Sequence, residues 1–579
     1  MGKSIFVRSF GCQMNERDSE EILGMLTAQG YEIAEEPEAA DVTLLNTCSV
    51  RQHAEERAFG KMGELSELKQ ERPGLILGII GCMAKLRQKE IFRRLPKVDL
   101  IAGPAELYDL PYLLAEIQEK RQSPQEGQGA GGEGRGTKII AVNRPFRPLD
   151  KKPVGDYRAP GVSAFVTIME GCDKACTYCI VPKTRGQEIS RPAEEIIDEI
   201  NRLVAAGYQE VTLLGQNVNS YGKRFPDGSG YKGPLGRLRL LEEDPESLLD
   251  FPQLLRMIDA SVRGLAGDAG GRAPAARSRL GPTRPEGSGG GWESASTAGC
   301  RRRQDPPGLR IRFTTSHPFD ATERLFEAMR DCGSVCEWLH LPVQSGSTRI
   351  LRAMRRGYTA EAYLQKIEAV RRLVQEISLS TDIIVGFPGE TEDDFQATVR
   401  LLREVRYDNA YIFKYSPRPG TDAAAREDDV PQEVKEERNQ RLLELQGQIE
   451  QEGLRRLEGA EVEILVEERG RFARQWFGRT RGHHGLIVES SEDLRGQTVR
   501  VKVTRGTGHT LFGELARDVA RRRVGRPHRG GEIRDRGGAG AGAGGGDRLL
   551  RLDAGLPPDD RPVPVPHPRP ARPDPAPPH

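Results

Sequence analysis

Short apolar runs alternate with longer charged stretches in the amino-terminal part of the chain. The runs at Ser4–Ser9, Val42–Asn46 and Leu75–Ile80 have the length and composition of buried strands, and each precedes a charged stretch that is typical of a helix. Strands that alternate with helices in this way predict a parallel sheet. We therefore expect an α/β domain over residues 3–119.

The same alternation resumes at about residue 158 and continues to about residue 449. The runs with the pattern of strands are Val162–Glu170, Val211–Leu214, Arg310–Thr314, Glu337–Leu341, Ser378–Val385 and Asn409–Phe413. A series of this kind predicts a parallel barrel, complete or partial, in which chemistry gathers at the carboxyl ends of the strands.

The pattern changes again near residue 452, where charged and β-branched residues alternate. Runs at Glu461–Glu467, Gly485–Glu489 and Thr498–Thr504 predict a small β-barrel over residues 452–516. We expect its loops to carry a set of basic and aromatic side chains: Arg471, Arg474, Trp476, Phe477, Arg479, Arg481, His483, His484 and Arg505. Basic groups attract phosphates and aromatic rings stack on unpaired bases, so Arg479, Arg481 and Trp476 are candidate RNA contacts. Basic residues alone are more often a solvated surface.

Three segments have compositions that predict no packed core. Residues 120–157 are expected to form a linker, about 263–308 a disordered insertion in the barrel, and 520–579 a disordered tail. The chain has 579 residues with 86 basic and 85 acidic side chains, a length and charge balance that fit three domains. It has no apolar run of the length that a membrane span needs.

A Cys-x-x-x-Cys-x-x-Cys triplet, Cys172, Cys176 and Cys179, directly follows the first strand-like run of the central region. Three thiolates on a 4Fe-4S cubane leave the fourth iron open to an exogenous ligand. Zinc is the main alternative, and a fourth ligand such as His340 would complete such a site. A disulfide is less favoured, because the chain has nine cysteines and shows no charged-then-apolar signal peptide.

Cys12, Cys48 and Cys82 each stand just past one of the amino-terminal strands. Right-handed crossovers bring the carboxyl ends of successive parallel strands to one edge of a sheet, so we expect these cysteines to converge and to hold a second 4Fe-4S cluster. Gly11 and Gly81 would let the backbone pass close to it. A lone cysteine is usually a small buried hydrophobe.

The cysteines outside these two groups, Cys300, Cys332 and Cys336, are not expected to be ligands, although Cys332 and Cys336 have nearly the spacing of a metal site. Six thiols kept intact for metal are typical of a reducing compartment. We therefore expect a cytoplasmic protein.

Several motifs occur in a fixed order along the chain: Gly11-Cys-Gln-Met-Asn15, Asn46-Thr-Cys-Ser-Val-Arg51, Glu170-Gly-Cys-Asp-Lys-Ala-Cys-Thr-Tyr-Cys-Ile-Val-Pro182, Leu341-Pro-Val-Gln-Ser-Gly-Ser347 and Asp382-Ile-Ile-Val-Gly-Phe-Pro-Gly-Glu-Thr391. Together they resemble the radical S-adenosylmethionine methylthiotransferases, from about Lys3 to about Leu515. The first motif resembles the branch of that family that modifies N6-dimethylallyladenosine in tRNA. The sister tRNA branch is expected to have Gly-Cys-Lys-Val-Asn at this place.

The resemblance implies an amino-terminal domain with an auxiliary cluster, a partial (β/α)6 barrel with a cluster that binds S-adenosylmethionine, and an RNA-binding barrel called TRAM. It places Cys12, Cys48 and Cys82 on the auxiliary 4Fe-4S cluster and Cys172, Cys176 and Cys179 on the other. It also implies Gln216, Gln344 and Gly386, at strand ends, as neighbours of S-adenosylmethionine, and His317 less strongly.

The reaction that the resemblance implies is transfer of a methylthio group to C2 of N6-dimethylallyladenosine at position 37 of tRNA. A 5′-deoxyadenosyl radical would remove the hydrogen, the auxiliary cluster would supply the sulfur, and a second S-adenosylmethionine would donate the methyl group. The implied partners are this tRNA and an electron donor such as a flavodoxin or ferredoxin, for a chain that acts as a monomer. The alternatives are a sister methylthiotransferase that modifies threonylcarbamoyladenosine or a ribosomal protein, and a non-catalytic cluster-bearing protein that binds RNA or senses redox state.

Overall fold

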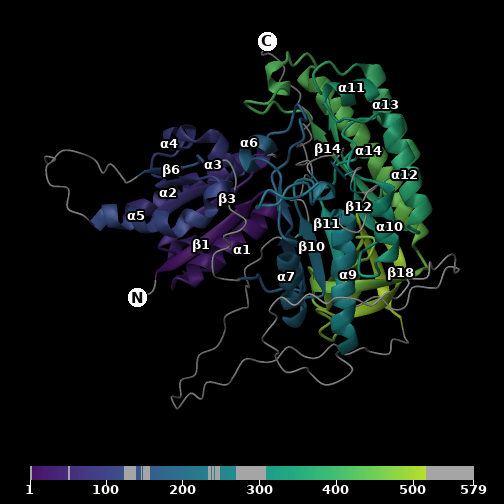
Figure 1. Ribbon diagram of the computed structural model, residues 1–579, viewed down its shortest axis with the longest axis horizontal. Helices are drawn as coiled ribbons and strands as arrows, with labels where there is room; N and C mark the ends of the chain where they lie inside the picture. Colours follow the sequence, from purple (N-terminus) through teal and green to yellow (C-terminus); the bar gives the residue numbers. More distant parts are fainter. Residues whose placement is uncertain are drawn as a thin grey trace, which may run out of the picture. The chain divides into compact units, whose positions relative to one another are not determined.

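A computed structural model describes residues 3–49, 52–122, 138–144, 147, 157–231, 236–237, 240, 248–268 and 308–516. All of these belong to one unit of the chain, residues 1–527. Figure 1 shows three groups of elements in chain order: a sheet with its helices, a larger layer of strands and helices, and a small barrel of strands.

The amino-terminal sheet is six-stranded and parallel, with the strand order β2-β1-β3-β4-β5-β6. Its strands are β1 Ser4–Phe10, β2 Glu32–Ile33, β3 Val42–Thr47, β4 Ile76–Gly81, β5 Leu100–Ala102 and β6 Ile139–Ala141. Its main helices are α1 Gln13–Thr27, α2 Gln52–Glu71, α3 Cys82–Arg87, α4 Lys89–Arg94 and α5 Leu110–Gln122. Side chains of α1 and α5 pack on one face and those of α2, α3 and α4 on the other, so each face has its own apolar cluster. This confirms the predicted parallel α/β sheet.

Strand β6 corrects the predicted linker over residues 120–157. The apolar run Ile139–Ala141 pairs in parallel with β5, and Ile139 donates a backbone hydrogen bond to Asp99. The glycine-rich composition around it hid a strand that is only three residues long. The rest of the predicted linker lies mostly outside the described residues.

The central region contains two parallel three-stranded sheets, with the orders β7-β10-β11 and β12-β13-β14. A parallel bridge between Ile311 and Val335 joins β11 to the segment just before β12, which makes a six-stranded partial barrel. The strands are β7 Ser163–Thr167, β10 Glu210–Leu214, β11 Arg310–Thr314, β12 Trp338–His340, β13 Ser378–Val385 and β14 Asn409–Lys414. The main helices are α7 Ala193–Ala205, α9 Phe251–Asp268, α10 Glu323–Asp331, α11 Thr348–Ala353, α12 Ala360–Leu373 and α13 Glu392–Val405. One apolar cluster fills the space between these strands and helices.

The run Val162–Glu170 does not form the single strand that its pattern predicts. The backbone N–H of Ile168 donates to Leu214, but the Ile168 carbonyl accepts from Arg191, so the chain leaves the sheet after β7. The last two residues form β8, Met169–Glu170, which pairs antiparallel with β9, Ile189–Ser190. This detour brings the cysteine triplet back against the segment before Ile189.

The carboxyl-terminal barrel is closed, with the strand order β15-β16-β17-β19-β18. Its strands are β15 Glu461–Arg469, β16 Gln475–Thr480, β17 Gly485–Glu489, β18 Thr498–Thr507 and β19 Thr510–Leu515. The predicted barrel is therefore confirmed, but the sequence analysis missed β16 and β19. Three residues that we expected in loops, Trp476, Phe477 and Arg479, lie on β16, and Arg505 lies on β18.

Helix α14, Gln432–Arg456, runs through the expected boundary between the barrel domains. Its Leu442 and Ile449 belong to the apolar cluster of the central region, whereas Leu454 belongs to that of the small barrel. Helix α9 continues to Asp268, so the expected insertion starts later than residue 263. The tail from residue 520 and residues 269–307 lie outside the described part. No helix in the described part is long and apolar enough to cross a membrane.

Candidate functional site

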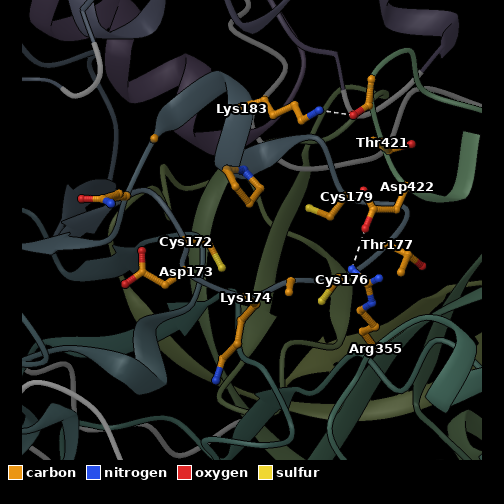
Figure 2. A pocket seen from close by; sticks show the side chains of 15 residues that line it. Cys172, Asp173, Lys174, Cys176, Thr177, Cys179, Lys183, Arg355, Thr421 and Asp422 are labelled. Atoms are coloured by element: carbon orange, nitrogen blue, oxygen red, sulfur yellow. Dashed lines mark hydrogen bonds and ion pairs between the residues drawn. The ribbon is translucent and has the colours of Figure 1, made fainter. Parts of the chain in front are cut away.

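The cysteine triplet surrounds a cavity at the carboxyl edge of the partial barrel. Cys172, Cys176 and Cys179 lie in the loop between β8 and helix α6, Val181–Arg185, and all three line a space of about 370 Å³. Figure 2 shows their sulfur atoms around this space, with Lys174 and Arg355 at its rim. The opposite wall comes from residues 420–422, which follow β14. The cavity therefore lies beyond the carboxyl ends of β8 and β14.

The triplet loop is held by close backbone packing. Gly171 has φ of +76°, and a Cβ built there would come closer than 3.0 Å to the carbonyl group of Gln187. The backbone N–H of Cys172 donates to Gly186 at 3.2 Å, and Asp173 accepts the N–H of Glu188 at 3.0 Å. A side chain at position 171 would separate these two segments, so glycine is needed to form the loop.

The donor set fits an iron–sulfur cluster better than a single ion. Among the residues that the structure describes, no three His, Cys, Asp or Glu side chains converge closely enough to hold one metal ion. A zinc ion needs its ligands around one point, whereas a cubane spreads its thiolates over a body of several atoms. His340, which the zinc alternative named as a possible fourth ligand, lies 3.0 Å from the Ser380 hydroxyl and is not in the cavity wall.

Burial makes two of the triplet cysteines poor acids in the metal-free chain. It raises the pKa of Cys172 to about 12, although a hydrogen bond from the Lys174 backbone lowers it. It raises the pKa of Cys179 to about 11. Metal binding must therefore displace protons from these thiols, which couples cluster assembly to pH.

Cys176 is approached by two nitrogen donors from other loops. Nη1 of Arg356 lies 3.4 Å from its Sγ, and Nε2 of His317 lies 3.8 Å from it. The backbone N–H of Phe319 donates to Nδ1 of His317, so the ring proton is on Nε2 and faces the sulfur. Burial, with Arg356 and Lys174 nearby, lowers the pKa of His317, which keeps the imidazole neutral.

Cys12, Cys48 and Cys82 lie at one edge of the amino-terminal sheet. The last residues of the three strands are in register, since Phe10 pairs with Thr47 and Thr47 pairs with Gly81. Each cysteine follows its strand end by one or two residues. A Cβ built on Gly11 would overlap Cβ of Cys48, so the Cys12 and Cys48 loops lie against each other.

Asparagine side chains and a buried arginine organise this second cysteine group. Cys12 Sγ lies 3.2 Å from Oδ1 of Asn15, whose amide donates to Oδ1 of Asn46 at 2.8 Å. A hydrogen bond with Cys48 lowers the pKa of Cys12 to about 6, against the effect of burial and with the help of Arg185. Burial raises the pKa of Cys82, which Arg185 opposes. Cys12 is therefore the cysteine of this group that ionises most readily.

A buried ionic network connects the two cysteine groups. Asp18, on α1, pairs with Arg147 and with Arg185 at 2.7 Å each, and Arg147 also pairs with Glu170 at 2.8 Å. All four side chains are at most 6% exposed. Glu170 lies two residues before Cys172. The network therefore connects the sheet edge that carries Cys12, Cys48 and Cys82 to the loop that carries the triplet.

Comparison with known proteins matches the same three regions. The model of uncharacterized protein family UPF0004 matches residues 4–103, that of the radical SAM superfamily residues 166–402, and that of the TRAM domain residues 455–516. The tRNA-2-methylthio-N(6)-dimethylallyladenosine synthase of Carboxydothermus hydrogenoformans is 41% identical to this chain, over 89% of this chain and 99% of its own length. The chain belongs to the tRNA-2-methylthio-N(6)-dimethylallyladenosine synthase family.

A second member of the family, from Desulforamulus reducens, is 40% identical over 89% of this chain and 95% of its own length. Among solved structures, the radical S-adenosylmethionine methyltransferase TsrM from Kitasatospora setae is similar, with a TM-score of 0.46 and 14% identity over 73% of this chain and 77% of that chain. The family resemblance drawn from the cysteine motifs is thus confirmed.

The expected cofactor neighbours lie at strand ends but do not line the cavity. Gln216 follows β10, and its Oε1 is buried without a hydrogen-bond partner among the described residues. Gln344 is 6% exposed, and its backbone bridges to Asp382 and Ile384 of β13. Gly386 donates its N–H to Glu390, which pairs with Arg438. Of these three, only Gln216 offers an unpaired buried polar atom to a ligand.

The three expected RNA contacts, Trp476, Arg479 and Arg481, make contacts within the protein. Trp476 is 2% exposed and belongs to the apolar core of the small barrel, so neither face of its ring is free to stack. Arg479 pairs with Glu467 inside the same barrel. Arg481 pairs with Glu337 at 2.7 Å and donates to the carbonyl of Val335 at 2.6 Å, which attaches the barrel to the central region. Trp476 and Arg479 lie on β16, which the sequence pattern did not predict, whereas Arg481 lies in the turn after it.

Other residues of the site escaped the sequence analysis. Residues 420–422 and Arg355 line the cavity, and Arg356 contacts Cys176. The Gly420-Thr-Asp422 turn follows a predicted strand, so the strand-end rule could have found it. Nothing in the sequence marks Arg356 as different from Arg355. Cys332 and Cys336 are buried and free, and Cys300 lies outside the described residues.

Proposed function

We propose that this protein transfers a methylthio group to C2 of N6-dimethylallyladenosine at position 37 of tRNA. The observation that carries the proposal is the pair of three-cysteine sites, one around a cavity at the barrel edge and one at the edge of the amino-terminal sheet. A buried network of ion pairs connects them. Family membership supports the substrate, because the relatives bear the name of that reaction.

The cysteines have the chemistry to hold two 4Fe-4S clusters. Cys172, Cys176 and Cys179 would hold the cluster that binds S-adenosylmethionine, and three thiolates leave one iron for that ligand. When bound, cluster and S-adenosylmethionine supply the one-electron chemistry that reaction at an unactivated aromatic C–H bond requires. Cys12, Cys48 and Cys82 would hold the second cluster, which we propose as the sulfur source, with a second S-adenosylmethionine as methyl donor.

The chain's own residues bind and position these groups. The cavity wall contains the cations Lys174 and Lys183, which would attract the anionic carboxylate of the cofactor. Lys174 pairs with Asp320 at 2.7 Å, and Asp320 accepts from Asn217 at 2.6 Å. These contacts tie the triplet loop to the ends of β10 and β11. We propose that Gln216 points its free Oε1 to the cofactor from the same side.

The small barrel presents an exposed set of side chains for RNA at the tip of the β15–β16 hairpin. Phe472 is 64% exposed, and the guanidinium of Arg471 lies 5.7 Å from its ring centre. Arg469 and Arg474 are exposed beside them. An exposed aromatic ring can stack on an unpaired base, and the arginines around it can bind the phosphates. We propose this tip, in place of Trp476, Arg479 and Arg481, as the RNA contact.

Replacing Phe472 with alanine should weaken tRNA binding without destabilising the fold. Loss of one stacked base costs about 1–3 kcal/mol, so Kd should rise by about fivefold or more. Filter binding or fluorescence anisotropy with tRNA measures this at fixed salt. Tyr112→Ala is the control, because Tyr112 is 77% exposed but lies on α5 of the amino-terminal domain. Equal Kd values for the two variants would refute the contact.

The proposed reaction is tested by nucleoside analysis of tRNA. Reconstituted protein, S-adenosylmethionine and a low-potential one-electron donor are incubated with tRNA that carries N6-dimethylallyladenosine. Mass spectrometry should then find the methylthio derivative of that nucleoside. Product only from threonylcarbamoyladenosine tRNA would favour the sister activity, and no cleavage of S-adenosylmethionine would favour a non-catalytic protein. We propose a flavodoxin or ferredoxin as donor, and a cytoplasmic monomer as the working form.

A further inference from the structure

A buried cation behind the cysteine triplet, Arg356, has no carboxylate partner among the described residues. Arg356 is 5% exposed, and among the described residues its guanidinium makes no salt bridge to Asp or Glu. Its hydrogen bonds go to the carbonyl of Pro342 at 2.8 Å, the Tyr358 hydroxyl at 3.0 Å, the Tyr178 hydroxyl at 3.3 Å and Sγ of Cys176 at 3.4 Å. The carbonyl is neutral, and phenols are neutral near pH 7.

A buried charge is costly unless it is paired. Cys176 is the only contact of Arg356 among these that carries a negative charge when it binds metal. The guanidinium therefore has its counter-charge only when a thiolate, on a metal centre, stands at Cys176. The arginine is held there by three other contacts, so its guanidinium has a fixed position beside Cys176.

His317 adds a second donor to the same sulfur. Its Nδ1 accepts the N–H of Phe319, which leaves Nε2–H directed at Cys176 from the loop after β11. At the other two triplet cysteines the nearby donors are backbone groups, of Lys174 at Cys172 and of Val181 at Cys179. Cys176 is therefore the triplet sulfur whose environment depends on side chains, one charged and one neutral.

We propose that Arg356 and His317 are positioning residues for the cluster on Cys172, Cys176 and Cys179, and that their N–H donors at Cys176 raise its reduction potential. Donors to a ligating sulfur withdraw electron density and stabilise the reduced, more negative cluster. Arg356 acts as the counter-cation and His317 as a neutral donor. This inference rests on the proposed function only in requiring a cluster at the triplet.

The test measures the midpoint potential of this cluster alone. The full chain with Cys12→Ala, Cys48→Ala and Cys82→Ala is reconstituted, and reduction is followed by electron paramagnetic resonance against redox mediators. Into this background go Arg356→Met, Arg356→Lys and His317→Leu. At the midpoint potential of the parent protein, Arg356→Met should lower the ratio of reduced to oxidised cluster at least tenfold, which is about 59 mV for one electron. His317→Leu should give a smaller change of the same sign.

Arg355→Met is the matched control. Arg355 is the preceding residue, lines the same cavity and pairs with Asp422 at 2.5 Å, but it is 56% exposed and contacts no thiol in the described part of the chain. Its removal should leave the potential unchanged, because solvent screens its charge. Arg356→Lys should fall between parent and Arg356→Met, since it keeps the charge but not the planar fork.

The outcomes separate this inference from the proposed function. Absence of iron in the parent background would refute the cluster at the triplet and with it the proposed function. A loaded cluster whose potential is the same in His317→Leu, Arg356→Met and the control would overturn the inference alone. If Arg356→Met does not load iron, His317→Leu decides: a lower potential supports the inference, and an unchanged one overturns it.

Discussion

Alanine in place of Gly171 is expected to abolish iron binding at the triplet and with it the cleavage of S-adenosylmethionine. A left-handed backbone costs a residue with a side chain about 1–2 kcal/mol, and the new Cβ would also overlap the backbone carbonyl of Gln187. Neither of the two chain segments in this contact can move away easily, because the backbone N–H of Cys172 donates to the carbonyl of Gly186. The loop would open, and of about eight irons per chain about four should remain.

Gly207→Ala separates strain from overlap. Gly207 also has a positive φ, +95°, but nothing lies within 4 Å of its Cβ position. It should show a modest loss of stability of about 1 kcal/mol and a normal iron content. Iron and sulfide analysis with Mössbauer spectroscopy measures both variants. A Gly171→Ala protein with full iron would mean that the triplet loop can form without its contact to residues 186–187.

Asp18→Asn is expected to destabilise the chain by about 3–5 kcal/mol, because it leaves two buried guanidinium groups without their shared carboxylate. Arg147 and Arg185 each lie 2.7 Å from an oxygen of Asp18. Glu170 stays beside Arg147 and compensates in part, so the lower value is expected. Since Arg185 also stabilises ionised Cys12, the auxiliary iron should be lost before that of the triplet.

The pH dependence of this effect has a definite sign. Burial alone would raise the pKa of Asp18, but Arg147 and Arg185 hold it below its usual value. A carboxyl whose pKa is lowered by folding stabilises the protein fully above its unfolded pKa, about 3.9, and loses this contribution as the pH falls through its folded pKa. The difference between wild type and Asp18→Asn should therefore be complete at pH 7 and should shrink below about pH 4.

Urea unfolding of metal-free wild type and Asp18→Asn, at pH 7 and at a pH below about 4, measures the difference in their free energies of unfolding. Glu323→Gln is the control, because Glu323 pairs with Arg372 at 3.0 Å on the surface, where both side chains are more than 60% exposed. Such a pair contributes about 0–1 kcal/mol. Equal unfolding midpoints for the two variants would show that the buried network adds no stability.

Much of the fold follows from local sequence pattern. The runs Arg310–Thr314, Ser378–Val385 and Gly485–Glu489 are strands with the predicted bounds, because strong apolar or β-branched alternation leaves little choice. The convergence of Cys12, Cys48 and Cys82 follows from topology, since parallel strands end at one edge. Burial of Trp476 does not follow, because the other buried positions of Gln475–Thr480 are Gly478 and Thr480, so the strand shows no clear apolar alternation.

The candidate site was predictable only where ligands are set by chemistry. Three cysteines at close spacing predict a metal site. Arg356 and His317, in contrast, contact Cys176 from loops more than a hundred residues away in the chain, and sequence spacing does not reveal such contacts. The ionic network around Asp18 is hidden for the same reason. Charged residues in a helix such as α1 are usually solvated, and the packing of α1 against segments distant in the sequence buries them here.

Helix α14 connects the small barrel to the central region. One unbroken helix contributes side chains to two cores, and Arg312 fastens the small barrel further by donating to the carbonyls of Thr480 and Arg481 at 2.7 Å. The barrel is thus a rigid extension of the region that holds the cavity. On the proposed function, the distance between the RNA contact at Phe472 and the cofactors is therefore fixed. The nucleotide that reacts is then chosen by its distance along the folded RNA as well as by its chemical identity.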